Sequence, residues 1–166
     1  MSFSVVILAA GKGTRMKSEK PKVLHTVGNA SMLHHVMEVA KRAGAEETVI
    51  VAGHQADLVS EAAKIKSPDA KIVIQEKQLG TGHAVKQAER LLGKSGKDIL
   101  ILYGDTPLIK SETISKLIKA RKTCDIAILG FDTKHPGMYG RLVSNGENII
   151  KIVEARDATK EQLNIS

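Results

Sequence analysis

A glycine-rich, cationic loop follows the first apolar run of the chain, which covers residues 3–10. The loop reads Gly11-Lys12-Gly13-Thr14-Arg15, and Lys22 follows a few residues later. Glycines directly after a buried strand let backbone N–H groups approach a phosphate, and Arg15 and Lys22 supply the distributed positive charge that a triphosphate needs. Neither the dinucleotide fingerprint nor the P-loop fits, because both require glycine where Met16 stands. The loop alone therefore leaves two interpretations open, a phosphate site or a plain turn with solvated cations.

A second glycine-bearing loop runs from Gln75 to His83. Gln75 stands at the end of an expected strand, and its amide offers both a donor and an acceptor for reading the edge of a base. Gly80 permits close approach of the backbone, and Thr81 is expected to cap the helix that follows. His83 falls in the first turn of that helix, where a histidine is more often packed or solvent-facing than catalytic, so we assign it no role.

A carboxylate follows the most apolar run, residues 98–103, in the sequence Tyr103-Gly104-Asp105. An unpaired negative charge is costly at the end of a buried strand, so Asp105 requires a cation or a hydrogen-bonded partner. Magnesium takes oxygen ligands and bridges substrate phosphates, usually with only one or two protein carboxylates. The position predicts a Mg²⁺ ligand, and the alternative is a turn-forming aspartate before Pro107.

A fourth region lies further along the chain, where Asn145-Gly146 predicts a tight turn between two short strands at 141–144 and 148–154. Gly140 precedes this hairpin and would let a sugar ring lie against the backbone. Glu154 ends it and could accept hydrogen bonds from sugar hydroxyls. The alternative is an exposed hairpin with ordinary surface charges.

These loops are positioned by an alternation of strands and helices. Apolar β-branched runs predict the strands, and helical periodicity predicts the helices, of which Ser31 would cap the first and Gly44 would end it. The alternation predicts an α/β fold, a Rossmann-like, mostly parallel sheet with helices on both faces, with ligands beyond the carboxyl ends of its strands. The expected strands are 3–10, 48–52, 71–75, 98–103 and 125–129, and the expected helices cover about 32–43, 58–65, 81–92 and 111–118. With no linker or internal repeat, we expect residues 1–166 to form a single domain that adds a small antiparallel hairpin.

The composition narrows the class of protein. The 166 residues are 42% hydrophobic and 26% charged, as in folded domains, and no apolar run is long enough to cross a membrane. No basic segment precedes the first apolar run, and Cys124 is the single cysteine, so we expect no secretory signal, no internal disulfide and a cytoplasmic location. The net charge of +7 favours anionic partners, but with 2% aromatic residues and scattered lysines these are expected to be small phosphorylated molecules rather than nucleic acid.

Together the motifs resemble those of the sugar nucleotidyltransferases. In order and spacing they are most similar to the bacterial bifunctional N-acetylglucosamine-1-phosphate uridyltransferase / glucosamine-1-phosphate acetyltransferase family. The resemblance runs from about residue 4 to the last residue. It is carried by the segments Leu8–Met16, Pro21–His25, Gln78–Ala84, Tyr103–Asp105, Tyr139–Arg141, Ile152–Glu154 and Asp157-Ala158.

The resemblance implies an enzyme that makes UDP-N-acetylglucosamine and pyrophosphate from UTP and N-acetylglucosamine-1-phosphate, for peptidoglycan and lipopolysaccharide synthesis. A sugar-phosphate oxygen would attack the α-phosphorus of UTP in line. The resemblance assigns charge neutralisation in catalysis to Arg15 and Lys22, and Mg²⁺ ligation to Asp105. The substrate-binding positions that it implies, with those for uracil first, are Gln75, Gly80, Thr81, Leu8, Ala9, Ala10, Gly11, Gly13, Tyr103, Gly104, Gly140 and Glu154.

The chain also departs from this family. Arg156 stands where lysine is usual, and Met138 where a small or polar residue is usual. Family members continue beyond the equivalent of Ser166 into strands that complete the sugar and Mg²⁺ sites, and then into an acetyltransferase domain through which the full-length relatives form homotrimers. We therefore expect a domain truncated at its C-terminal side that is weakly active or inactive alone.

Two further functions stay open at this point. One is a related sugar-1-phosphate nucleotidyltransferase that uses glucose-1-phosphate or CTP. The other is a non-catalytic nucleotide-binding fragment.

Overall fold

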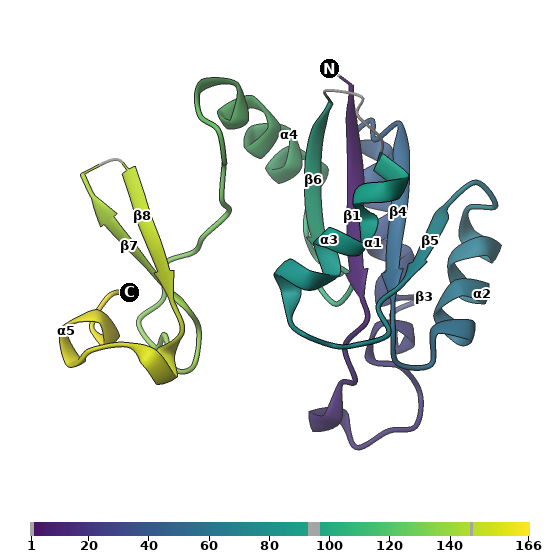
Figure 1. Ribbon diagram of the computed structural model, residues 1–166, viewed down its shortest axis with the longest axis horizontal. Helices are drawn as coiled ribbons and strands as arrows, with labels where there is room; N and C mark the ends of the chain where they lie inside the picture. Colours follow the sequence, from purple (N-terminus) through teal and green to yellow (C-terminus); the bar gives the residue numbers. More distant parts are fainter. Residues whose placement is uncertain (1, 93–96, 147) are drawn as a thin grey trace. The chain divides into compact units, whose positions relative to one another are not determined.

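The computed structural model describes residues 2–92, 97–146 and 148–166, and its largest element is a four-stranded parallel sheet. The strand order is β5-β4-β1-β6, which places β1 between β4 and β6 (Figure 1). Because β1 is hydrogen-bonded on both edges and covered on both faces, nearly all of its residues are buried, as its apolar run predicts. The strands are β1 (Phe3–Ala9), β4 (Glu47–Ala52), β5 (Lys71–Ile74) and β6 (Asp98–Tyr103).

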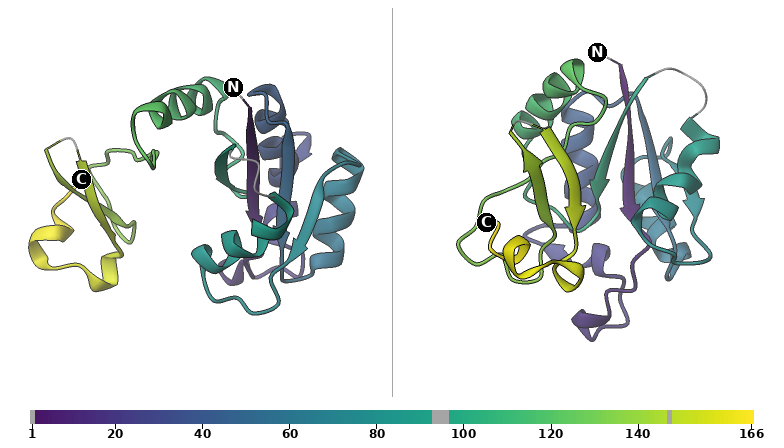
Figure 2. Two further views of the ribbon diagram at one scale, coloured as in Figure 1. Left: turned by 45° about the horizontal axis from the view of Figure 1, so that its top comes forward. Right: turned by 60° about the vertical axis from the view of Figure 1, so that its left-hand side comes forward.

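Helices cover both faces of the sheet, as the alternation of strands and helices predicts. On one face, α1, α2 and α4 enclose a core that includes Ile7 and Ile50. On the other face, α3 packs its alanines against Val6, Val49 and Val51, and Figure 2 shows α1 and α3 on opposite sides of the sheet. None of the helices in the described residues is long and apolar enough to span a membrane. The helices are α1 (Met32–Arg42), α2 (Ala56–Lys66), α3 (Thr81–Leu92) and α4 (Ser111–Ala120).

Short elements connect β1 to α1 and shape the glycine-rich loop. Ser31 caps α1 as predicted, because its hydroxyl oxygen accepts a hydrogen bond from the His34 N–H at 3.2 Å. Thr81, by contrast, is the first residue of α3 rather than the residue before it. The short elements between β1 and α1 are η1 (Thr14–Met16), η2 (Lys22–Leu24), β2 (Thr26–Val27) and β3 (Ala30–Ser31), and η3 (Arg121–Thr123) follows α4.

The chain divides into two compact units, residues 1–123 and 124–166. The second unit contains the antiparallel hairpin predicted around Asn145-Gly146, formed by β7 (Arg141–Asn145) and β8 (Asn148–Val153). After it come η4 (Ala155–Asp157) and α5 (Lys160–Leu163), which Thr159 and Gln162 close with a capping box. Arg141 is only 3% exposed, and its guanidinium donates to the backbone oxygens of Tyr139, Gly137 and Leu163.

The fifth expected strand, residues 125–129, is not formed. Its apolar side chains are largely exposed to solvent, Ile126 to 76% and Leu129 to 54%. A β-branched run favours extended backbone, but it becomes a strand only when a neighbouring strand pairs with its N–H and C=O groups. Within the described residues no strand pairs with this segment, so the parallel sheet has four strands rather than five.

Candidate functional site at the carboxyl edge of the sheet

The loops that follow β1 and β6 touch at the carboxyl edge of the sheet. The two strands are parallel neighbours, with Leu8 opposite Tyr103, so both chains leave the sheet on the same side. The N–H of Gly104 donates to the carbonyl oxygen of Leu8 at 2.9 Å. A Cβ at position 104 would lie 3.1 Å from that oxygen and 3.2 Å from Cγ1 of Val23, so only glycine fits without displacing the backbone of β1.

Lys22 and Asp105 meet just beyond these strand ends. The Nζ of Lys22 lies 2.6 Å from Oδ2 of Asp105, and their side chains are 35% and 31% exposed. Pro21 precedes Lys22 and sets the start of η2, while Asp105 follows Gly104 directly. Two residues that the sequence assigns to phosphate and metal, 83 positions apart, are therefore in direct contact.

Gly13 holds the glycine-rich loop against this ion pair. It adopts φ +59°, in the left-handed region, and a Cβ on it would lie 2.8 Å from Cβ of Lys22. Gly11 has open space around it, and Arg15 projects from η1 as an exposed side chain for which the described residues show no ion pair. The loop thus leaves two exposed cations, Lys12 and Arg15, and open backbone at Gly11.

Gly53 makes a close backbone approach at this edge of the sheet that was not predicted from the sequence. It follows β4, and a Cβ on it would lie 2.8 Å from Cβ and 2.9 Å from the carbonyl oxygen of Ala10. His54 then donates its N–H to that same oxygen at 3.3 Å. The signal was present, because Gly53 directly follows a buried apolar strand, just as Gly11 and Gly104 do.

A neutral hydrogen-bond network lies beyond β5. Gln75 is 3% exposed, and its side-chain nitrogen donates to the carbonyl oxygen of Gly80 at 3.1 Å and lies 2.9 Å from Nδ1 of His83. Nε2 of His83 is 3.1 Å from the side-chain nitrogen of Gln87. His83 and Gln87 also line a hollow of about 330 Å³ with Ile74, Glu76 and Lys77. His83, for which we predicted no role, therefore contacts Gln75, the predicted base reader, directly.

The residues predicted to bind sugar belong to both compact units: Tyr103 lies in the first, and Gly140 and Glu154 lie in the second. Tyr103 ends β6 and is 51% exposed. Gly140 lies against β8, since a Cβ on it would be 3.3 Å from Cγ2 of Ile152. Glu154 is exposed and precedes η4. The roles of these residues in binding sugar stay predictions.

Asp105 offers one carboxylate ligand, which fits a metal ion that takes its other ligands from the substrate and water. In the described residues no group of three or more histidine, cysteine, aspartate or glutamate side chains is placed to hold an ion. Asp105 keeps one carboxylate oxygen outside its contact with Lys22. Magnesium accepts such a donor set, because it uses one or two protein carboxylates and takes its other ligands from phosphates and water.

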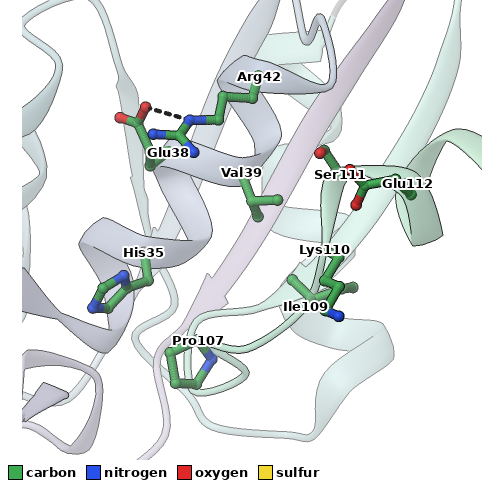
Figure 3. A pocket seen from close by; sticks show the side chains of 9 residues that line it. All are labelled: His35, Glu38, Val39, Arg42, Pro107, Ile109, Lys110, Ser111 and Glu112. Carbon is green, nitrogen blue, oxygen red and sulfur yellow. Dashed lines mark hydrogen bonds and ion pairs between the residues drawn. The ribbon is translucent and has the colours of Figure 1, made fainter. Parts of the chain in front are cut away.

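Another hollow lies between α1 and the segment that leads into α4 (Figure 3). Its volume is about 370 Å³, and none of the predicted site residues lines it. Glu38, on its wall, accepts hydrogen bonds from Lys66 and Arg42, which hold the pKa of its carboxyl below the ordinary value. The residues that line it are His35, Glu38, Val39, Arg42, Pro107, Ile109, Lys110, Ser111 and Glu112.

Comparison with known families shows which family the chain belongs to. Residues 5–158 match the MobA-like NTP transferase domain, which is nearly the whole chain. The chain belongs to this family. It is therefore a nucleotidyltransferase domain, and enzymes of this kind generally use a divalent metal ion.

Curated relatives share much of the sequence. Over 159 residues the chain is 50% identical to the bifunctional protein GlmU of Ruegeria sp. strain TM1040, a match that covers 96% of the chain and 35% of the relative. It is 49% identical over 162 residues to the bifunctional protein GlmU of Ruegeria pomeroyi, covering 98% of the chain and 36% of the relative. The chain thus spans about a third of the length of these relatives.

A solved structure confirms the predicted fold. HddC from Yersinia pseudotuberculosis is 26% identical and superposes with a TM-score of 0.71, over 91% of this chain and 68% of that one. The prediction of a mostly parallel, Rossmann-like nucleotidyltransferase fold with an antiparallel hairpin is therefore confirmed.

Proposed function

We propose that this chain binds UTP at the carboxyl edge of its sheet and transfers the uridylyl group to N-acetylglucosamine-1-phosphate. The products are UDP-N-acetylglucosamine and pyrophosphate, which would supply peptidoglycan and lipopolysaccharide synthesis in the cytoplasm. The observation that carries the proposal is the contact of Lys22 with Asp105, 2.6 Å apart, against the glycines that follow β1 and β6. The 50% identity to a GlmU relative supports the choice of nucleotide and sugar.

The reaction asks for positioning and charge neutralisation more than for covalent chemistry. An oxygen of the sugar phosphate forms a bond to the α-phosphorus of UTP, and the bond from that phosphorus to the β-phosphate oxygen breaks. The leaving pyrophosphate carries away the electron pair. The protein must therefore hold the two substrates in line and stabilise the added negative charge.

Lys22 and Arg15 are placed to stabilise that charge. An ammonium has three donors, and Asp105 uses one of those of Lys22, so two remain for phosphate oxygens. The exposed guanidinium of Arg15 can grip the departing pyrophosphate with two parallel hydrogen bonds. The open backbone at Gly11 lets phosphate approach the N–H groups between these two cations.

Asp105 would hold the Mg²⁺ ion, whose chemistry is to neutralise the phosphates and orient them for attack. The carboxylate is half-buried at the end of a rigid central strand, so its position is fixed before substrate arrives. Its contact with Lys22 keeps the negative charge paired in the free protein, which lowers the cost of placing it there.

The proposal is tested by release of pyrophosphate from UTP with N-acetylglucosamine-1-phosphate and Mg²⁺, alongside calorimetric titration of UTP and UDP-N-acetylglucosamine. Since the chain spans about a third of the relatives' length, we expect binding and only weak turnover. CTP and glucose-1-phosphate, each replacing one substrate, are expected to give less product. Failure of both uridine nucleotides to bind would overturn the proposal, and a faster reaction with CTP or glucose-1-phosphate would replace its substrates.

A further inference from the structure

We propose that His83 is a positioning residue for nucleotide selection. Its ring fixes the side-chain amide of Gln75 so that only the amide oxygen remains to meet the base, and this favours uracil over cytosine. The inference rests on the proposed function, because Gln75 can act on a base only if a nucleotide binds at this edge of the sheet.

The orientation of the Gln75 amide follows from its partners. A carbonyl oxygen can only accept a hydrogen bond, so the group that faces the carbonyl of Gly80 at 3.1 Å must be the NH₂ group of Gln75. The same nitrogen lies 2.9 Å from Nδ1 of His83, so its second hydrogen points to the ring. Gln75 is 3% exposed, which leaves little room for another arrangement.

The contact with Gln75 also fixes the hydrogen of the His83 ring. To accept from the amide, Nδ1 must keep its lone pair, and the hydrogen of the neutral ring must then sit on Nε2. The side-chain nitrogen of Gln87 lies 3.1 Å from Nε2 and also donates to the carbonyl oxygen of His83 at 3.3 Å. Turning the Gln87 amide over gives up that longer bond but presents an oxygen acceptor to the hydrogen on Nε2. In this turned arrangement Gln87 accepts from the form of His83 that Gln75 requires.

As a consequence, the Gln75 side chain can offer a base only a hydrogen-bond acceptor. Both N–H groups of Gln75 are used within the protein, and none of the hydrogen bonds in the described residues involves its amide oxygen. A free glutamine amide can turn over and offer either a donor or an acceptor, but this one offers only an acceptor. An acceptor that faces N3 of the base distinguishes the two pyrimidines, because uracil carries a hydrogen on N3 and cytosine carries a lone pair there.

The test compares the affinities of the 166-residue chain for UDP and CDP by calorimetry, in the parent and in His83 variants. In His83→Leu the acceptor is lost, the Gln75 amide is held by one bond instead of two, and the preference for UDP is expected to fall about tenfold, the effect of one hydrogen bond. In His83→Asn the side-chain oxygen can take the place of Nδ1, so most of the preference is expected to return. A merely structural role would not be rescued in this way.

Two more variants keep the result interpretable. His35→Leu is the matched control, because the ring of His35 is likewise held by one polar partner, the backbone carbonyl of Val27, but lies on α1, and the variant should keep the preference for UDP. Gln87→Leu leaves His83 in place, removes its second partner, and is expected to lower the preference about two- to threefold, less than a full hydrogen bond. It replaces His83→Leu should that variant fail to fold.

The outcomes separate the two proposals. A parent chain that binds neither UDP nor CDP overturns the proposed function and this inference together. A parent chain that prefers UDP, with folded His83→Leu and Gln87→Leu variants that prefer it equally, overturns the inference alone. Loss of preference in both variants and its return in His83→Asn supports it.

Discussion

Two clusters at the same edge of the sheet are held together by different forces. Beyond β1 and β6, Lys22 and Asp105 form a half-exposed ion pair among tightly packed glycines. Beyond β5, the buried amide of Gln75 is held by uncharged partners, Gly80 and His83. A half-exposed ion pair contributes little to stability and can exchange partners for a charged ligand, whereas a buried amide keeps its orientation because each lost bond leaves an unpaired polar group.

Under the proposed function, this difference suits the two clusters to different tasks. Phosphate groups must enter, change bonding and leave, which suits charges that are accessible and weakly committed. A base must be recognised in one orientation, which suits a reader that the protein has fixed in advance. The comparison predicts that changes to the charged side chains, Lys22 and Asp105, alter activity more than stability, and that changes in the neutral cluster alter stability and selectivity.

The largest effect is expected from Asp105→Asn. The substitution keeps the size of the side chain but removes the charge that holds Lys22 and that, under the proposed function, would hold the metal ion. Uridylyl transfer is expected to fall about 100-fold, which corresponds to roughly 3 kcal/mol of transition-state stabilisation. The measurement is pyrophosphate release at saturating Mg²⁺, with Asp69→Asn, an exposed aspartate that precedes β5, as the matched control. Equal rates for the two variants would remove Asp105 from the reaction.

Gly13→Ala tests how tightly the charged cluster is packed. Alanine at position 13 must adopt the left-handed backbone conformation, and its Cβ would lie 2.8 Å from Cβ of Lys22. We therefore expect a loss of about 2–4 kcal/mol in the free energy of unfolding. Gly28→Ala is the control, since it has φ +62° but nothing within 4 Å and should cost only the backbone strain, about 1–2 kcal/mol. Urea denaturation measures both. A cost at Gly13 no greater than at Gly28 would mean that the loop does not press on Lys22.

Much of the fold could be predicted from sequence because its signals are local. Residues 3–9 and 98–103 form strands where apolar runs predicted them, and Ser31 caps α1 where its side chain suits that position. The prediction of a strand at 125–129 was wrong, because a β-branched run indicates extended backbone but not whether a neighbouring strand pairs with it.

The site was only partly predictable, because its contacts are not local. Placing Lys22 and Asp105 at the same edge follows from parallel strands, but their direct contact joins residues 83 apart and depends on how η2 folds. His83 carried no sequence signal of its own, since its importance comes from the atom of Gln75 that it contacts. The roles predicted for Gly140 and Glu154 stay predictions.

Lys22→Met and Gln75→Leu compare the stability and the activity of the two clusters directly, with one variant from each. Lys22→Met removes one half of an accessible ion pair, so we expect a change of less than about 1 kcal/mol in unfolding free energy together with a large loss of activity. Gln75→Leu leaves the Gly80 carbonyl and the His83 ring without their donor, and should cost about 1–2 kcal/mol. Thermal unfolding and pyrophosphate release, measured on both variants, decide the comparison. Greater destabilisation by Lys22→Met than by Gln75→Leu would reverse it.

The smallest effect is expected at Glu38, which bonds Lys66 and Arg42 outside both clusters. It measures how much a surface ion pair contributes to the stability of this protein. Hydrogen bonds from Lys66 and then Arg42 lower the pKa of Glu38 below 4.5, so the folded protein holds this carboxylate ionised more strongly than the unfolded chain does. The resulting stability is present above about pH 4.5 and is lost as the pH falls through the folded-state pKa. In urea denaturation, Glu38→Gln should therefore be slightly less stable than the parent at pH 7, and the difference should disappear once the pH lies below the folded-state pKa of Glu38. Glu61→Gln, at an exposed position of α2, should match the parent at pH 7. A difference between Glu38→Gln and the parent that persisted at the acid end would assign the effect to lost packing rather than to charge.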